Sequence, residues 1–120
     1  MEIGKAYGFF DCRASKEEIE AEIPVIRDLV RVPSQLELSL VEGVDKVKGD
    51  SKLSAVVEDA KEAGMRYAML VKYPDATNRK AAEELSSILN QYYQTPLYEE
   101  GEPFRGEVVY QDGANYKFLN

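Results

Sequence analysis

Four polar residues, Thr77-Asn78-Arg79-Lys80, follow an apolar segment and begin a long amphipathic stretch. The apolar segment, residues 67–71, lacks alternation, as in a buried strand with both faces covered. Ligands gather at such strand-to-helix corners in open α/β folds, and free N–H groups at a helix start favour anions. The corner therefore carries the chemistry of an anion site, with Arg79 as charge partner and Thr77 and Asn78 as orienting groups. Helix capping by Thr77 or Asn78 explains these residues without any ligand, and for these two it is the favoured interpretation.

A second basic side chain, Arg13, follows another expected strand at residues 5–12. If the strand–helix units share one sheet in parallel, the residues after their strands converge on one edge. We then expect Arg13 to join Thr77, Asn78 and Arg79 in one cleft for a phosphate or carboxylate group. This small-molecule site, in a binding protein or a histidine-independent enzyme, is the alternative functional hypothesis.

Several reaction classes are excluded by what the chain lacks. It contains no histidine, so a Ser-His-Asp or Cys-His catalytic set is impossible. Neither Gly-x-Gly-x-x-Gly nor Gly-x-x-x-x-Gly-Lys-Ser/Thr occurs, so no glycine-rich loop can hold a nucleotide. Cys12 is the single cysteine and fits a small buried hydrophobe better than a reactive thiol. Asp11 could pair with Glu42 or Asp75, but scattered carboxylates are common in an acidic chain, so we expect no metal and no cofactor.

Composition predicts one α/β domain over residues 1–120, because 120 residues with 44% hydrophobic content suffice for one core. The net charge of −7 and the scattered basic residues exclude nucleic acid as a general partner. The first residues lack the apolar core of a signal peptide, and no apolar run approaches the ~20 residues that span a bilayer. With one unpaired cysteine, these features predict a cytoplasmic protein without a membrane partner.

Local signals place three helices. Ser15 and Glu18 have the spacing of a capping box at a helix start. Pro24, well inside that helix, predicts a kink or a break into two short helices. Asp50 or Ser51 caps a second helix, which Gly64 ends, and the third helix follows the corner described above.

The order of elements predicts the fold. Strand and helix patterns alternate three times and then give a hairpin around Asp112-Gly113-Ala114-Asn115, which is the order β-α-β-α-β-α-β-β. We expect a two- or three-layer α/β domain with a mixed sheet of four or five strands and a C-terminal hairpin. The alternative is a ferredoxin-like α+β sandwich with an inserted second helix. The half-buried pattern of Leu36, Leu38 and Leu40 suits that alternative.

Aromatic residues gather late in the chain, around a long loop at residues 95–106. Tyrosine is enriched at association surfaces, and Tyr93 falls off the apolar stripe of its helix. Tyr93, Tyr98 and Phe104 are therefore candidate interface residues. The function itself is unknown from sequence; the leading hypothesis is a small non-catalytic binding or assembly domain that contacts a protein partner or further copies of itself through this segment, the long loop or the hairpin.

Overall fold

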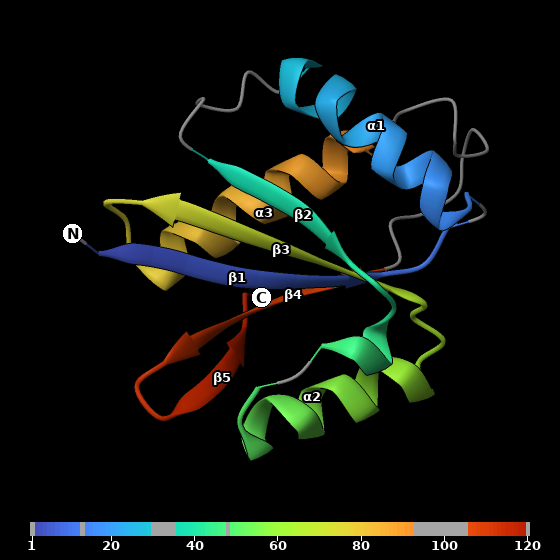
Figure 1. The fold of residues 1–120 in the computed structure, drawn as a ribbon. Helices are drawn as coiled ribbons and strands as arrows, with labels where there is room; N and C mark the ends of the chain where they lie inside the picture. Colours follow the sequence, from blue (N-terminus) through green and yellow to red (C-terminus); the bar gives the residue numbers. More distant parts are fainter. Residues whose placement is uncertain (1, 13, 30–35, 48, 93–105, 120) are drawn as a thin grey trace.

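A computed structural model describes residues 2–12, 14–29, 36–47, 49–92 and 106–119 of the chain. Its five strands form one sheet in the order β2-β3-β1-β4-β5, and every neighbouring pair is antiparallel (Figure 1). The strands are β1 (Ile3–Phe10), β2 (Glu37–Val41), β3 (Tyr67–Pro74), β4 (Gly106–Asp112) and β5 (Asn115–Phe118).

The helices are α1 (Lys16–Leu29), α2 (Ser51–Glu62) and α3 (Asn78–Tyr92), with a short 3₁₀ helix η1 (Val44–Lys46) before α2. This order confirms the predicted β-α-β-α-β-α-β-β succession and the C-terminal hairpin. The positive φ of Gly113 at the first turn position is that of a type II′ turn, which matches the twist of paired strands.

The predicted mixed sheet is wrong in one respect, because the sheet contains no parallel pair among the described residues. β3 lies between β1 and β2, and β1 lies between β3 and β4. The two strands of the unit β1-α1-β2 are therefore separated by β3, and the two strands of the unit β3-α3-β4 are separated by β1. That is the ferredoxin-like arrangement of the alternative prediction, with α2 inserted between β2 and β3.

The helix starts follow the local signals. Ser15 Oγ accepts a hydrogen bond from Glu18 N at 3.2 Å, and Glu18 Oε1 accepts one from Ser15 N at 3.3 Å, which completes the capping box. Asp50 caps α2, and Gly64 with φ 87° follows its end. Pro24 lies inside α1 without a break, so the division into two helices is wrong. Apolar residues on both sides of Pro24 pack into one core, and this packing holds the helix together.

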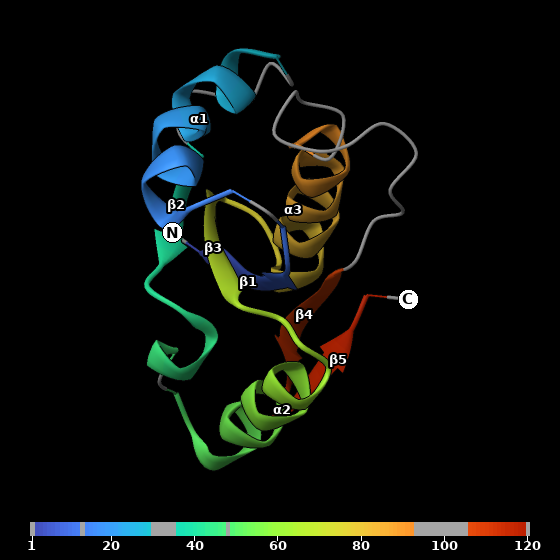
Figure 2. The ribbon, with the colours of Figure 1, turned by 90° about the vertical axis from the view of Figure 1, so that its right-hand side faces the viewer.

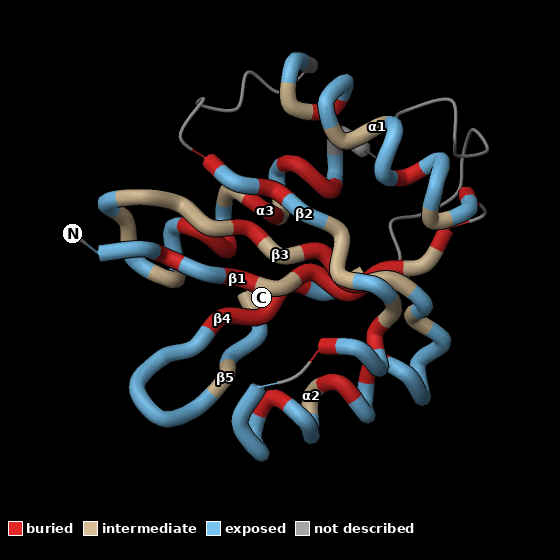
Figure 3. The backbone as a smooth tube through the Cα atoms, viewed as in Figure 1, coloured by how far each residue is buried: buried red, intermediate tan, exposed pale blue. Residues whose placement is uncertain are grey.

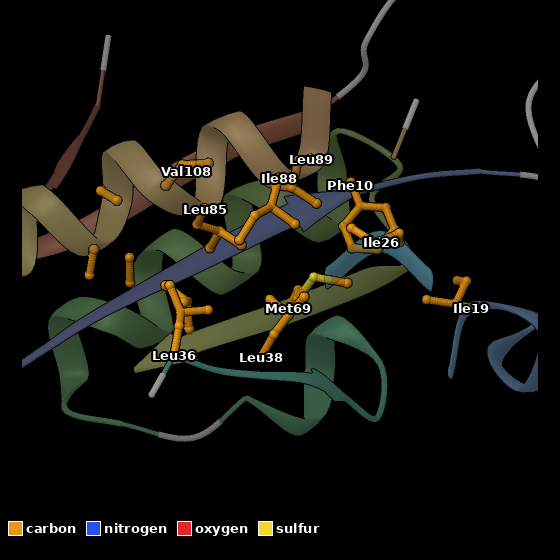
Figure 4. Close-up of a cluster of buried hydrophobic side chains, with 14 of the residues drawn as sticks. Phe10, Ile19, Ile26, Leu36, Leu38, Met69, Leu85, Ile88, Leu89 and Val108 are labelled. Carbon is orange, nitrogen blue, oxygen red and sulfur yellow. The ribbon is translucent and has the colours of Figure 1, made fainter. Parts of the chain in front are cut away.

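One face of the sheet is covered by α1 and α3 (Figures 2 and 4). Its core brings buried residues of the two helices against side chains of four strands, among them Phe10, Leu38, Met69 and Val108. Gly8 allows close packing, because a Cβ atom there would lie 2.6 Å from Leu89 Cδ1 of α3. α3 thus lies directly on the central strand β1.

The other face carries α2, which Figure 2 shows on the opposite side of the sheet from α1 and α3. Buried residues of α2 and η1 pack against one buried side chain each from β1, β3 and β4, namely Phe9, Ala68 and Val109. The partly buried Tyr7 of β1 and Tyr116 of β5 also pack against this core. Figure 3 shows buried positions alternating with exposed ones along α2. The molecule therefore has three layers, and its second face is only partly covered.

Candidate binding surface

The corner after β3 holds three of the predicted site residues together, and its polar groups bind the protein itself. Thr77 Oγ1 accepts a hydrogen bond from Lys80 N at 3.1 Å, as a helix cap does. Asn78 Oδ1 accepts from Lys5 N at 3.0 Å, and Asn78 Nδ2 donates to Gln111 O at 2.9 Å. Asn78 thus joins the start of β1 to the end of β4.

Arg79 at this corner is exposed and lies 3.6 Å from Glu83 through its Nε atom. Lys80 has an equivalent partner, Glu84, at 3.4 Å. Both pairs have the i,i+4 spacing of a helix surface, where such ion pairs contribute little stability. The two basic side chains therefore lie along α3 beside acidic partners of their own helix.

The opposite end of the sheet carries the residues after β1. Asp11 Oδ1 accepts a hydrogen bond from Arg66 Nε at 2.5 Å, and this arginine also donates to Cys12 O. The Asp11 carboxylate raises the pKa of Arg66, which lies over the ring of Tyr67. Tyr67 in turn donates its hydroxyl proton to Ala14 O at 2.6 Å. These contacts tie the first turn after β1 to the start of β3.

The expectation that residues after the three strands converge on one edge is wrong. β1 and β3 run antiparallel, with Phe10 opposite Tyr67 and Ile3 opposite Pro74. The corner after β3 therefore lies beside the start of β1, about 24 Å along the strand from its end. Four predicted site residues lie outside the described residues: Arg13, Tyr93, Tyr98 and Phe104.

A different surface emerges where α2 leaves the second face uncovered. The strand register places several side chains of this region on one face, together with Glu37 and Ser39 of β2. We call six of them the open half-face, and of these Tyr7 also packs against the α2 core: Ile3, Lys5, Tyr7, Leu70, Lys72 and Phe118. α2 lies towards the carboxyl end of β1, whereas these residues extend towards its amino-terminal end (Figure 1). The open half-face therefore borders the α2 core on one side and solvent on the other.

Large apolar side chains are exposed on the open half-face. Ile3 is 50% exposed and Phe118 is 46% exposed. Tyr7 and Leu70, which pair across β1 and β3, are half-buried. Partial burial raises the pKa of the Tyr7 hydroxyl, which like any tyrosine hydroxyl is neutral at ordinary pH. The surface thus offers apolar contact area together with a neutral hydrogen-bonding group.

Two lysines lie at the centre of the open half-face. Lys5 and Lys72 occupy directly opposite positions on β1 and β3. Lys72 Nζ lies 4.0 Å from Glu37 Oε2 on the edge strand β2. Within the part of the chain that the structure describes, Lys5 forms no ion pair. Two positive charges thus lie side by side on this face, although the chain as a whole has a net charge of −7.

The sequence contains a signal for this surface, although no motif marks it. Ile3, Lys5 and Tyr7 alternate with the buried side of the first strand, and Lys72 follows the apolar segment by one residue. Alternation alone identifies the face of β1. It cannot reveal that Lys72 is opposite Lys5, because strand pairing is a property of the tertiary fold.

A hollow of about 320 Å³ near α2 is a weaker candidate for a site. Its lining includes Asp45, Lys61 and Arg66, together with apolar groups of Val44 and Met65. Arg66 is already bonded to Asp11 and Cys12. Among the described residues no group of three His, Cys, Asp or Glu side chains is arranged to hold a metal ion, and no described helix has the length and apolarity to cross a membrane.

Comparison with protein-family models, curated proteins and solved structures finds no match for this chain. The functional argument therefore depends on the surface itself.

Proposed function

We propose that this protein is a small binding or assembly domain that makes its contacts through the open half-face and the adjoining C-terminal hairpin. The observation that carries the proposal is the exposure of Ile3 and Phe118 on a sheet face that α2 covers only in part. Exposed apolar groups that gather on one face, beside polar residues, mark interaction sites more often than scattered ones do.

The strand pairing supports the same proposal. Phe118 lies opposite Val109, which lies opposite Tyr7, which lies opposite Leu70. Side chains at directly opposite positions share a face, so these residues form one row across four strands. Val109 itself is 0% exposed under α2, so a partner would contact the row in two places, at Phe118 on the hairpin and at Tyr7 with Leu70 on the central strands.

The aromatic segment with Tyr93, Tyr98 and Phe104 stays a predicted second part of the interface, because it lies outside the described residues. The cytoplasmic location is likewise proposed, on the basis of the single free cysteine, Cys12.

Light scattering of the purified protein over a range of concentrations tests the proposal, together with analysis of any protein that co-purifies. We expect a complex, either of several copies or with a partner, that dissociates in the Ile3→Asp/Phe118→Asp double variant. Val25→Asp is the matched control, since Val25 is a similarly exposed apolar residue on α1. A monomer without any partner, or a complex that survives in the double variant, would overturn the proposal.

A further inference from the structure

The paired lysines of the open half-face destabilise the sheet through repulsion between their like charges. Lys5 and Lys72 lie directly opposite each other on neighbouring strands, where side chains stand about 5 Å apart at Cβ. Like charges in this relation destabilise a strand pair. Glu37 lies near Lys72, but at 4.0 Å and in solvent it compensates little. A locally unfavourable pair in an otherwise consistent fold is a common sign of a functional position.

Apolar residues flank the lysine pair on both sides along the strands. On β1 the same face carries Ile3, Lys5 and Tyr7, and on β3 Lys72 lies two residues from Leu70. Successive residues on one face of a strand are about 7 Å apart. The surface therefore repeats an apolar, basic, apolar pattern at the spacing of an extended chain.

The size of the surface favours a peptide segment over a folded partner. It measures about 14 Å across the four strands from β3 to β5 and about 14 Å along β1, from standard strand dimensions. That is about 200 Å² in plan, well below the about 800 Å² that each partner of a typical stable protein pair buries. An extended segment of about five residues spans the length along β1.

Charge argues against a second copy in a symmetric contact on this face. A two-fold axis that passes close to Lys5 and Lys72 would bring the lysines of the two copies together. Carboxylates, in contrast, form charge-assisted hydrogen bonds with two ammonium groups at once. Negative charge more than about 8 Å away is screened at physiological salt, whereas Glu37, 4.0 Å from Lys72, stays within range and offsets part of the charge of the two lysines.

We infer that the open half-face binds an extended acidic segment of another protein, with an apolar residue two positions before and two positions after an Asp or Glu. The carboxylate lies between Lys5 and Lys72, and the two apolar side chains contact Ile3 on one side and Tyr7 with Leu70 on the other. This inference rests on the proposed function and names its partner class.

Selection from a displayed library of random peptides tests the inference. We expect enrichment of peptides that share a five-residue motif. An Asp or Glu stands at its centre, apolar residues stand at its first and last positions, and the second and fourth positions are free to vary. The Lys5→Gln/Lys72→Gln double variant should bind the best selected peptide at least tenfold more weakly in fluorescence anisotropy. Lys46→Gln, an exposed lysine on η1, is the control and should bind unchanged. Circular dichroism establishes that the variants are folded.

Two further measurements separate the possible results. Replacing the acidic residue of the selected peptide by its amide should weaken binding as much as the double variant does, and raised salt should weaken it further. Apolar peptides without an acid, bound through Ile3 and Phe118, would overturn the inference and leave the proposed function intact. A library without enrichment, or peptides that bind the double variant equally well, would overturn the inference. Failure of the proposed function itself would appear independently in the Ile3→Asp/Phe118→Asp scattering experiment.

Discussion

The two faces of the sheet differ in how they use the same strands. On β1, Gly4, Ala6, Gly8 and Phe10 are buried beneath α3 and its neighbours, whereas the alternate positions face the side of α2. Small residues on the first side let a helix approach the strand closely. The second side carries lysines and exposed apolar groups, and among the described residues no helix covers this part of the sheet. One strand thus contributes both to the main core and to the candidate binding surface.

The comparison shows that one sheet can have a closely packed face and a face that is partly open to a partner. Two helices cover the first face almost completely, and the central residues of its core are fully buried. A single helix of 12 residues covers the second face and reaches only part of it. Stability should therefore depend mainly on the first face and partner binding on the second.

The largest expected effect comes from a cavity in the covered face. Leu85 of α3 has 0% exposure, so Leu85→Ala should lower the free energy of unfolding by about 2–5 kcal/mol. Leu70→Ala, on the open half-face, should cost much less because Leu70 is not enclosed. Urea denaturation of both variants measures the difference, and equal losses would contradict the contrast between the faces.

A smaller loss is expected from crowding the contact between β1 and α3. In Gly8→Ala the new methyl group would lie 2.6 Å from Leu89 Cδ1 and 3.2 Å from Leu85 Cδ2. Overpacking of this kind costs about 1–3 kcal/mol. The change should leave binding at the open half-face unaltered, since Gly8 is on the other side of β1. Denaturation and peptide anisotropy on the same variant test both statements.

Loss of a helix cap should weaken the second face selectively. Asp50 Oδ1 accepts hydrogen bonds from Lys52 N and Leu53 N, both at 3.0 Å. Asp50→Ala should therefore cost about 1 kcal/mol. Amide hydrogen exchange should quicken in α2 more than in α3, and Ser51→Ala, an exposed change one residue away, serves as the control. Uniform quickening of both helices would indicate that the two faces unfold together.

The smallest expected effect has the opposite sign. Lys5→Thr removes the repulsion with Lys72, so the free energy of unfolding should rise by about 0.2–1 kcal/mol at low salt. The gain should shrink as salt increases, because salt screens exposed charges. The same variant should bind the selected acidic peptide more weakly. A loss of stability in Lys5→Thr, with Lys46→Thr unchanged, would remove the argument that the lysine pair is kept for binding.

Local chemistry made much of the fold predictable. The capping box of Ser15 and Glu18, the cap at Asp50 and the hairpin turn at Gly113 all depend on residues within a few positions of one another. The alternation of Leu38 and Leu40 on the edge strand β2 was also predictable from the sequence. Strand direction was not, because an amphipathic pattern is the same whichever way a neighbour runs.

The candidate site was the less predictable part for the same reason. The corner with Thr77 and Asn78 was found from sequence, but its side chains cap α3 and join β1 to β4. Antiparallel pairing placed Asp11 at the other end of the sheet from this corner. The open half-face, which is now the candidate site, depends on residues far apart in the chain, such as Lys5 and Lys72.

The sequence by itself determined the succession of helices and strands, the positions of their caps and the absence of histidine chemistry, because each depends on residue type and short-range spacing. Only the tertiary structure decided that β1 and β3 are antiparallel and that α2 covers part of one face. Both outcomes arise from contacts between residues distant in sequence, where burial of apolar surface across the whole sheet outweighs any local preference. The opposition of Lys5 to Lys72 follows from those contacts alone.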